Sequence, residues 1–158
     1  MRFPIEFVRC GDARNAGKNE QLEITASFSI RQMRVGLSVV AFVVDTGCDI
    51  SFISYGDACK LNIPLNGLPE KGETHIGNTT FLMSELPVFG LTLESEAGEP
   101  VRIDVDHFHV AKTRKKSIAD VELAKAIPSI LGLDFMRRNR LALHVEPANN
   151  LAYFEKIG

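Results

Sequence analysis

Residues 39–47 read VVAFVVDTG, an apolar run that ends abruptly in a carboxylate, a hydroxyl and a glycine. A run of this kind is typical of a strand buried on both faces. The end of such a strand is a rigid place for Asp45, and a carboxylate there costs free energy unless it is paired, hydrated or used. Gly47 lacks a Cβ, so a backbone or a ligand can come close. We therefore place the functional centre at Asp45.

A second segment, residues 127–136, reads IPSILGLDFM and places a glycine after a short apolar run. This segment and Asp-Thr-Gly at residues 45–47, in this order, resemble the retropepsin-like (retroviral-type) aspartic proteases, over roughly residues 22–154. The resemblance implies an all-β fold, mainly strands with two or three short helices, closed like a β-barrel. We divide the chain into an N-terminal strand and arm, residues 1–21, and a retropepsin-like domain, residues 22–158.

Hydrophobic periodicity and turn residues predict where the other elements lie. Apolar and polar residues alternate from Leu22 to Ile30, as in a half-buried strand. Ser117 and Asp120 form a capping-box-like pair at the start of a helix that must end before Pro128. The expected strands are residues 3–8, 22–30, 35–44, 51–54, 81–93, 101–110, 141–145 and 151–154, and the expected helices are residues 55–61, 117–126 and 134–139.

An aspartic protease needs two carboxylates that share one proton, so that one acts as a base and the other as an acid. The chain contains one Asp-Thr-Gly and no Asp-Ser-Gly. The resemblance therefore implies a homodimer in which a two-fold axis brings two copies of Asp45 together, an isologous contact. Chain-terminal strands often join the dimer sheet in this family, which makes residues 151–154 the candidate strand. The predicted activity is that of an aspartic endopeptidase acting on a peptide or protein substrate.

The resemblance also implies a role for each residue of the loop. Asp45 is the catalytic carboxylate, Thr46 hydrogen-bonds across the two-fold axis, and Gly47 exposes backbone to the substrate. Asp49 either lies near the substrate main chain or stabilises the loop as an acid, and both roles stay open. Cys48 replaces the hydroxyl residue that follows this glycine in pepsin-type enzymes, and a thiol is a weak donor. We therefore expect an activity optimum in weak acid.

Residues 65–80 are rich in turn-forming residues and occupy the place of the family's flap, a mobile hairpin that covers the substrate. Gly77-Asn78 can form the hairpin turn, and Ile76 and Gly77 are the candidate substrate-binding residues near its tip. The family's flap tip has several glycines close together, which this segment lacks. An ordinary surface hairpin is the alternative interpretation.

The 158 residues fit one domain with a sizeable core. A net charge of −2 gives no indication of a nucleic-acid partner or of an anionic membrane surface. No apolar run reaches the roughly 18 residues that span a bilayer, and residues 1–6 lack the apolar region of a secretory signal, so we expect a cytoplasmic protein. Cys10, Cys48 and Cys59 are expected to be free thiols.

Other chemistries have weaker support. His107 and His109 share a face if they lie on a strand, but two ligands fall short of the three or four at zinc sites, so we expect no metal and no cofactor. Cys48 has no adjacent histidine to activate it as a nucleophile. Two alternatives to the peptidase stay open. One is a retropepsin-like fold with weak or no catalysis that serves as a dimerisation or peptide-binding module. The other is an unrelated β-rich domain in which Asp-Thr-Gly is a turn.

Overall fold

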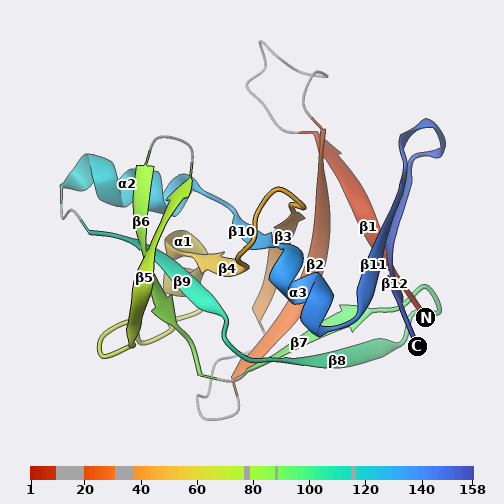
Figure 1. The fold of residues 1–158 in the computed structure, drawn as a ribbon, viewed down its shortest axis with the longest axis horizontal. Helices are drawn as coiled ribbons and strands as arrows, with labels where there is room; N and C mark the ends of the chain where they lie inside the picture. Colours follow the sequence, from red (N-terminus) through yellow and green to blue (C-terminus); the bar gives the residue numbers. More distant parts are fainter. Residues whose placement is uncertain (10–19, 31–37, 77–78, 88, 115–116) are drawn as a thin grey trace.

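The computed structural model describes residues 1–9, 20–30, 38–76, 79–87, 89–114 and 117–158. These residues form mostly strands, with three short helices and one 3₁₀ turn (Pro147–Asn149), which agrees with the predicted all-β class (Figure 1). The strands are β1 (Arg2–Arg9), β2 (Glu20–Ile30), β3 (Ser38–Val44), β4 (Phe52–Ser54), β5 (Glu70–Ile76), β6 (Thr79–Glu85), β7 (Phe89–Glu94), β8 (Pro100–Val105), β9 (His109–Thr113), β10 (Ser129–Leu131), β11 (Leu141–Glu146) and β12 (Leu151–Lys156). The helices are α1 (Tyr55–Lys60), α2 (Ile118–Ala126) and α3 (Leu133–Arg138).

The strands form one sheet that stays open, so the predicted barrel-like closure is wrong. Its main path runs β11-β12-β1-β2-β3-β10-β4-β9-β6-β5. The two ends of this path, β5 and β11, lie on opposite sides of the molecule (Figure 1). The physical reason is a fork at the long strand β2, which carries β3 on one edge and shares its other edge between β1 and β7. The sheet therefore divides into two branches there.

β12 lies inside the sheet, between β11 and β1. Phe154 pairs with Leu143 on one side and with Phe3 on the other. Both edges of this strand are paired within the chain, so β11 is the edge strand of this branch, and a part for residues 151–154 in a dimer sheet stays a prediction. The boundary predicted after residue 21 stays a prediction, although β1 pairs with β2 and with β12 in the same sheet.

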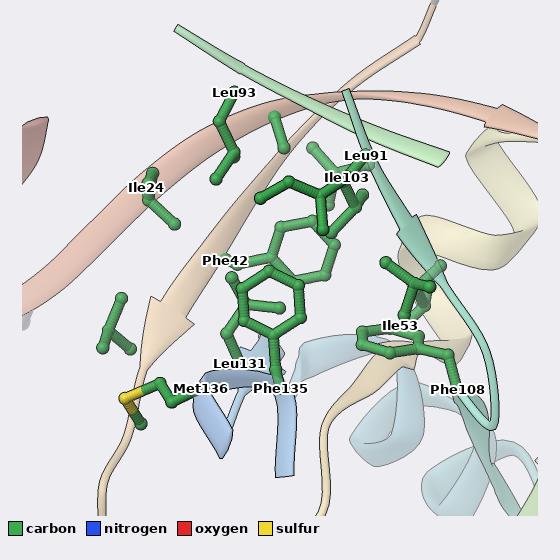
Figure 2. Packing of buried hydrophobic residues seen from close by; sticks show 14 of the residues in the cluster. Ile24, Phe42, Ile53, Leu91, Leu93, Ile103, Phe108, Leu131, Phe135 and Met136 are labelled. Atoms are coloured by element: carbon green, nitrogen blue, oxygen red, sulfur yellow. The ribbon is translucent and has the colours of Figure 1, made fainter. Parts of the chain in front are cut away.

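The core is built from one face of β3 and the elements packed on it. Phe42 is fully buried, and its ring meets that of Phe108 edge to face at a centroid distance of 6.1 Å. Phe135 of α3 and Leu131 of β10 point into the same cluster (Figure 2). On the opposite face of β3, Val39 is 64% exposed. The expectation that this strand is buried on both faces is therefore wrong, because that face is left partly open to solvent.

Two predicted strands are each divided in the structure. The strand predicted at residues 81–93 ends with β6 at Glu85 and resumes as β7, with Pro87 between them. Proline has no N–H for the ladder, which explains the break. The strand predicted at residues 101–110 is divided into β8 and β9 at His107, whose φ of 51° is left-handed and ends an extended segment.

The locally encoded elements are confirmed. The strand at residues 3–8 and the hairpin around residues 147–150 are present as β1 and as β11 with β12. Ser117 caps α2 as predicted, because its side chain accepts the backbone N–H of Asp120. Within the described ranges, no helix is long and apolar enough to cross a bilayer.

Candidate active site

The loop after β3 is held by the chain segment that joins β10 to α3. β3 and β10 are parallel neighbours, and the N–H of Asp45 continues their ladder by donating to the carbonyl of Leu131 at 3.1 Å. At the other end of the loop, the N–H of Leu133 donates to the carbonyl of Cys48 at 2.9 Å. Since β10 is itself paired on its other edge with β4, the Asp45 end of the loop is held at the centre of the sheet, and the Cys48 end is held by the first residue of α3.

Asp45 is half-buried at the end of β3, while Thr46 and Gly47 are exposed. The N–H of Gly47 donates to Oδ1 of Asp45 at 2.8 Å, which helps to fix the orientation of the carboxylate. A Cβ on Gly47 would lie 3.1 Å from that same oxygen, so any side chain there would crowd it. A side chain at this position therefore requires the Asp45 carboxylate to shift by a few tenths of an ångström.

A second polar cluster under the loop was not predicted as part of the site. The hydroxyl of Ser51, which is fully buried, accepts the N–H of Gly132 at 2.7 Å and donates to the carboxylate of Asp134. Asp134 also accepts the N–H of Phe135 at 2.7 Å. A Cβ on Gly132 would lie 2.4 Å from the carbonyl oxygen of Cys48, which leaves no room for any other residue. These contacts clamp the loop onto the start of α3.

The hydrogen bond of the Cys48 thiol goes to a backbone carbonyl and not to the Asp45 carboxylate. Its Sγ donates to the carbonyl of Ile50 at 3.1 Å. Burial raises the pKa of the Cys48 thiol, and the negative charges of Asp45, Asp134 and Asp49 raise it further. The thiol therefore stays protonated at neutral pH, which argues against a nucleophilic cysteine because the thiolate is the reactive form.

The predicted substrate-binding residues have different surroundings. Asp49 is exposed, and it makes no ion pair with any residue in the described part of the chain. Ile76 ends β5 and packs against the same small hydrophobic cluster as Cys48 and Ile50. Ile76 therefore belongs to the apolar surroundings of the loop. The predicted hairpin is present as β5 and β6, but Gly77 and the rest of its tip lie outside the described residues.

The two candidate metal-ligating histidines do not share one setting. His107 lies in the turn before β9 and its Nδ1 is 2.8 Å from Oε1 of Glu85. His109 is half-buried, and burial lowers the pKa of its imidazole. No group of three or more histidine, cysteine, aspartate or glutamate side chains suited to a metal ion occurs among the residues with described positions.

The fold of the chain has a counterpart among solved structures. No protein-family model matches the chain, and no curated protein matches it. The crystal structure of a retropepsin-like aspartic protease from Rickettsia conorii is similar, with a TM-score of 0.54 over 97% of this chain and 98% of that chain, at 17% identity. The chain therefore shares the fold of that protein from end to end.

Proposed function

We propose that the protein is an aspartic endopeptidase whose reaction centre is formed by two copies of Asp45, one from each subunit of a homodimer. The observation that carries this proposal is the setting of the carboxylate. It sits half-exposed at the end of a central strand, and among the described residues the N–H of Gly47 is its hydrogen-bond donor. A carboxylate that is rigidly held and left with an open side is suited to meet a second carboxylate and a water molecule.

The chemistry follows from the mutual repulsion of two close carboxylates. Like charges about 3 Å apart cannot both ionise, so the pair holds one proton. The ionised Asp45 takes a proton from a water molecule between the two side chains, and the resulting hydroxide attacks the peptide carbonyl carbon. The protonated Asp45 donates a hydrogen bond to the carbonyl oxygen as negative charge develops there. The carboxyl pair then gives a proton to the leaving nitrogen as the C–N bond breaks.

The loop residues support this arrangement. Thr46 is exposed next to Asp45, where a hydroxyl can hydrogen-bond to the corresponding loop of a second chain. Ile76 brings an apolar side chain to the cluster beside the loop, which suits contact with a substrate held under the β5–β6 hairpin. Asp49, exposed on the same loop, is available to contact substrate main chain or a second subunit. A peptide or protein is the substrate, and the protein works in the cytoplasm.

One observation favours a second function, a dimerisation or peptide-binding module with weak catalysis. The Cys48 thiol donates to the carbonyl of Ile50, so this position supplies no donor to the carboxylate. A centre with fewer donors stabilises the charge of the transition state less well.

Cleavage of a peptide library separates the two functions. The wild-type dimer is expected to cleave, and Asp45→Asn is expected to lose about a hundredfold to ten-thousandfold in rate, the usual contribution of a positioned acid or base. Cys48→Ala tests the thiol and should still cleave. Glu122→Gln, the same carboxyl-to-amide change on an exposed residue of α2, is the matched control. Peptide binding without cleavage by the wild-type dimer would support the module, and equal cleavage by Asp45→Asn would refute the mechanism.

A further inference from the structure

His109 is a titratable side chain close to the active-site loop that the proposed mechanism does not use. β9 runs parallel to β4, and His109 is the register partner of Phe52, the residue that follows Ser51. On the other edge of β9, His109 is the partner of Glu85 on β6. The imidazole is half-buried, and its Nδ1 is buried with no hydrogen-bond partner among the described residues. A buried polar atom without a partner needs an explanation.

The imidazole is linked to the clamp under the loop, in which Ser51 accepts the N–H of Gly132 and donates to Asp134. Burial lowers the pKa of the His109 imidazole most, and the charges of Glu85 and Asp134 and a hydrogen bond to the backbone of Ser51 oppose that shift. Since Nδ1 has no partner, the neutral ring keeps its proton on Nε2, the nitrogen left to reach the Ser51 carbonyl. One side of the imidazole therefore supports the clamp, and the other side is unpaired.

Among the described residues, the charged side chains close to the imidazole are Glu85 of β6 and Asp134 and Arg138 of α3. Arg138 is a cation and disfavours a second positive charge beside it. Glu85 already has two partners, Lys71 at 3.0 Å and His107 at 2.8 Å. Asp134 uses Oδ1 in the clamp, and its Oδ2 makes no hydrogen bond within the described ranges. Asp134 is therefore the acid most open to a new partner.

We propose that His109 is a positioning residue: its neutral imidazole supports the Ser51 clamp, and a second proton on the imidazole releases that clamp. The second proton goes to Nδ1, where no acceptor is in contact. A carboxylate that supplies an acceptor has to move, and movement of Asp134 draws it away from the Ser51 hydroxyl. The inference rests on the proposed function only where it predicts a rate of cleavage.

Release of the clamp displaces the carboxylate that carries out the chemistry. The N–H of Gly132 is bonded to Ser51, and the next residue, Leu133, holds the carbonyl of Cys48 at 2.9 Å. A shift of this segment therefore moves the loop that carries Asp45. Because a misplaced acid or base slows the chemical step, weak acid should lower kcat and change KM little.

Hydrogen exchange of the Gly132 amide tests the link without any substrate. If the open clamp gives His109 an ordinary imidazole pKa of about 6.5, the protection of this amide should fall between pH 7 and pH 5 by about fivefold to 25-fold. NMR measures this exchange, corrected for its intrinsic dependence on pH. The amides of β12 should stay more protected than Gly132 at both pH values, because the loop opens while the chain stays folded.

Two variants without a charge at position 109 separate the charge from the hydrogen bond. His109→Gln keeps an N–H donor, so the protection of Gly132 should match the wild type at pH 7 and change by no more than about twofold at pH 5. His109→Leu has no donor, so the protection should be low at pH 7 and equally low at pH 5. Circular dichroism establishes that each variant is folded, and His109→Leu still tests the pH dependence if His109→Gln does not fold.

His144→Gln is the matched control, because it makes the same change at a histidine that lies far from β9 in the sheet. His144 is on β11, where its Nε2 is 3.1 Å from the carboxylate of Glu155. This variant should retain the full wild-type fall in the protection of Gly132.

The pH dependence of kcat and KM tests the same residue in the reaction. His109→Gln should retain its kcat to lower pH than the wild type, so that the ratio of the two kcat values rises by about fivefold or more between pH 7 and pH 5. The KM values should stay similar. Circular dichroism at each pH corrects for the folded fraction, so a residue that acts on stability alone would leave the corrected ratio unchanged.

The outcomes separate this inference from the proposed function. An equal fall of Gly132 protection in the wild type and His109→Gln, or no fall in the wild type, overturns the inference. Exchange of Gly132 only together with the amides of β12 overturns it as well. A fall that depends on His109, in a chain that cleaves no peptide, leaves the inference standing and overturns the peptidase. Cleavage with the same dependence of kcat on pH in the wild type and His109→Gln overturns the inference and leaves the peptidase standing.

Discussion

Replacing Ser51 with alanine tests whether a buried hydroxyl clamps the active-site loop onto α3. Ser51 is fully buried, accepts the N–H of Gly132 at 2.7 Å and donates to the carboxylate of Asp134. Gly132 is buried too, so its N–H gains no water when the hydroxyl is removed. A buried donor left without a partner costs about 1–3 kcal/mol. Loss of the hydrogen bond to Asp134 adds about 1 kcal/mol, because that carboxylate is half-exposed and water replaces part of the contact.

The expected loss for Ser51→Ala is therefore about 2–4 kcal/mol of unfolding free energy, the sum of these two terms. Ser117→Ala is the matched control, because Ser117 also accepts a backbone N–H, from Asp120 at 3.2 Å, and also donates to an aspartate carboxylate. Ser117 is exposed, so its loss should cost about 1 kcal/mol, the usual value of a helix N-cap.

Urea unfolding of the two variants and the wild type at one protein concentration measures the difference, since dimerisation makes stability depend on concentration. The midpoint for Ser51→Ala should fall well below that of Ser117→Ala at an unchanged slope. If Ser51→Ala costs no more than Ser117→Ala, the buried clamp does not exist as described.

Two further predictions follow from the pKa values. In a Cys10→Ser background, iodoacetamide at neutral pH should modify the exposed Cys59 before Cys48, because burial first and neighbouring carboxylates second raise the pKa of the Cys48 thiol. Mass spectrometry of timed samples measures the order, and faster labelling of Cys48 would contradict the burial of its thiol. Burial lowers the pKa of the His109 imidazole in the folded state, so the unfolded chain binds more protons once the pH falls through the unfolded value of about 6.5. The folded state should therefore lose stability as the pH falls below that value, and His109→Gln should reduce this loss in urea titrations at pH 7 and pH 5. An identical pH dependence in the variant would refute this role.

Local signals in the sequence predicted the elements that depend on near neighbours. The apolar run before Asp45 predicted a central strand that ends at the carboxylate, and β3 ends at Val44. Ser117 predicted the start of α2 because a cap depends on residues three positions apart. Pro87 was a local signal for the break between β6 and β7, and the apolar pattern on either side of it concealed the break.

Contacts between residues far apart in the chain could not be predicted from local signals in the sequence. Ser51 and Asp134 are separated by 83 positions, and nothing in either segment alone indicates that they meet. The left-handed conformation of His107 also depends on its surroundings, because the same residue type occurs in extended strands.

The sequence by itself determined that an Asp-Thr-Gly loop follows an apolar strand and that one chain carries a single copy of it. Hydrophobic period and capping residues act over a few positions, so they can be seen without the fold. The tertiary structure alone decided that the sheet forks at β2 and stays open, that β12 is enclosed between β11 and β1, and that Thr46 lies in the wall of an apolar hollow. Those features arise from pairing and packing between segments far apart in the chain. Which segments pair with one another depends on the packing of the whole core.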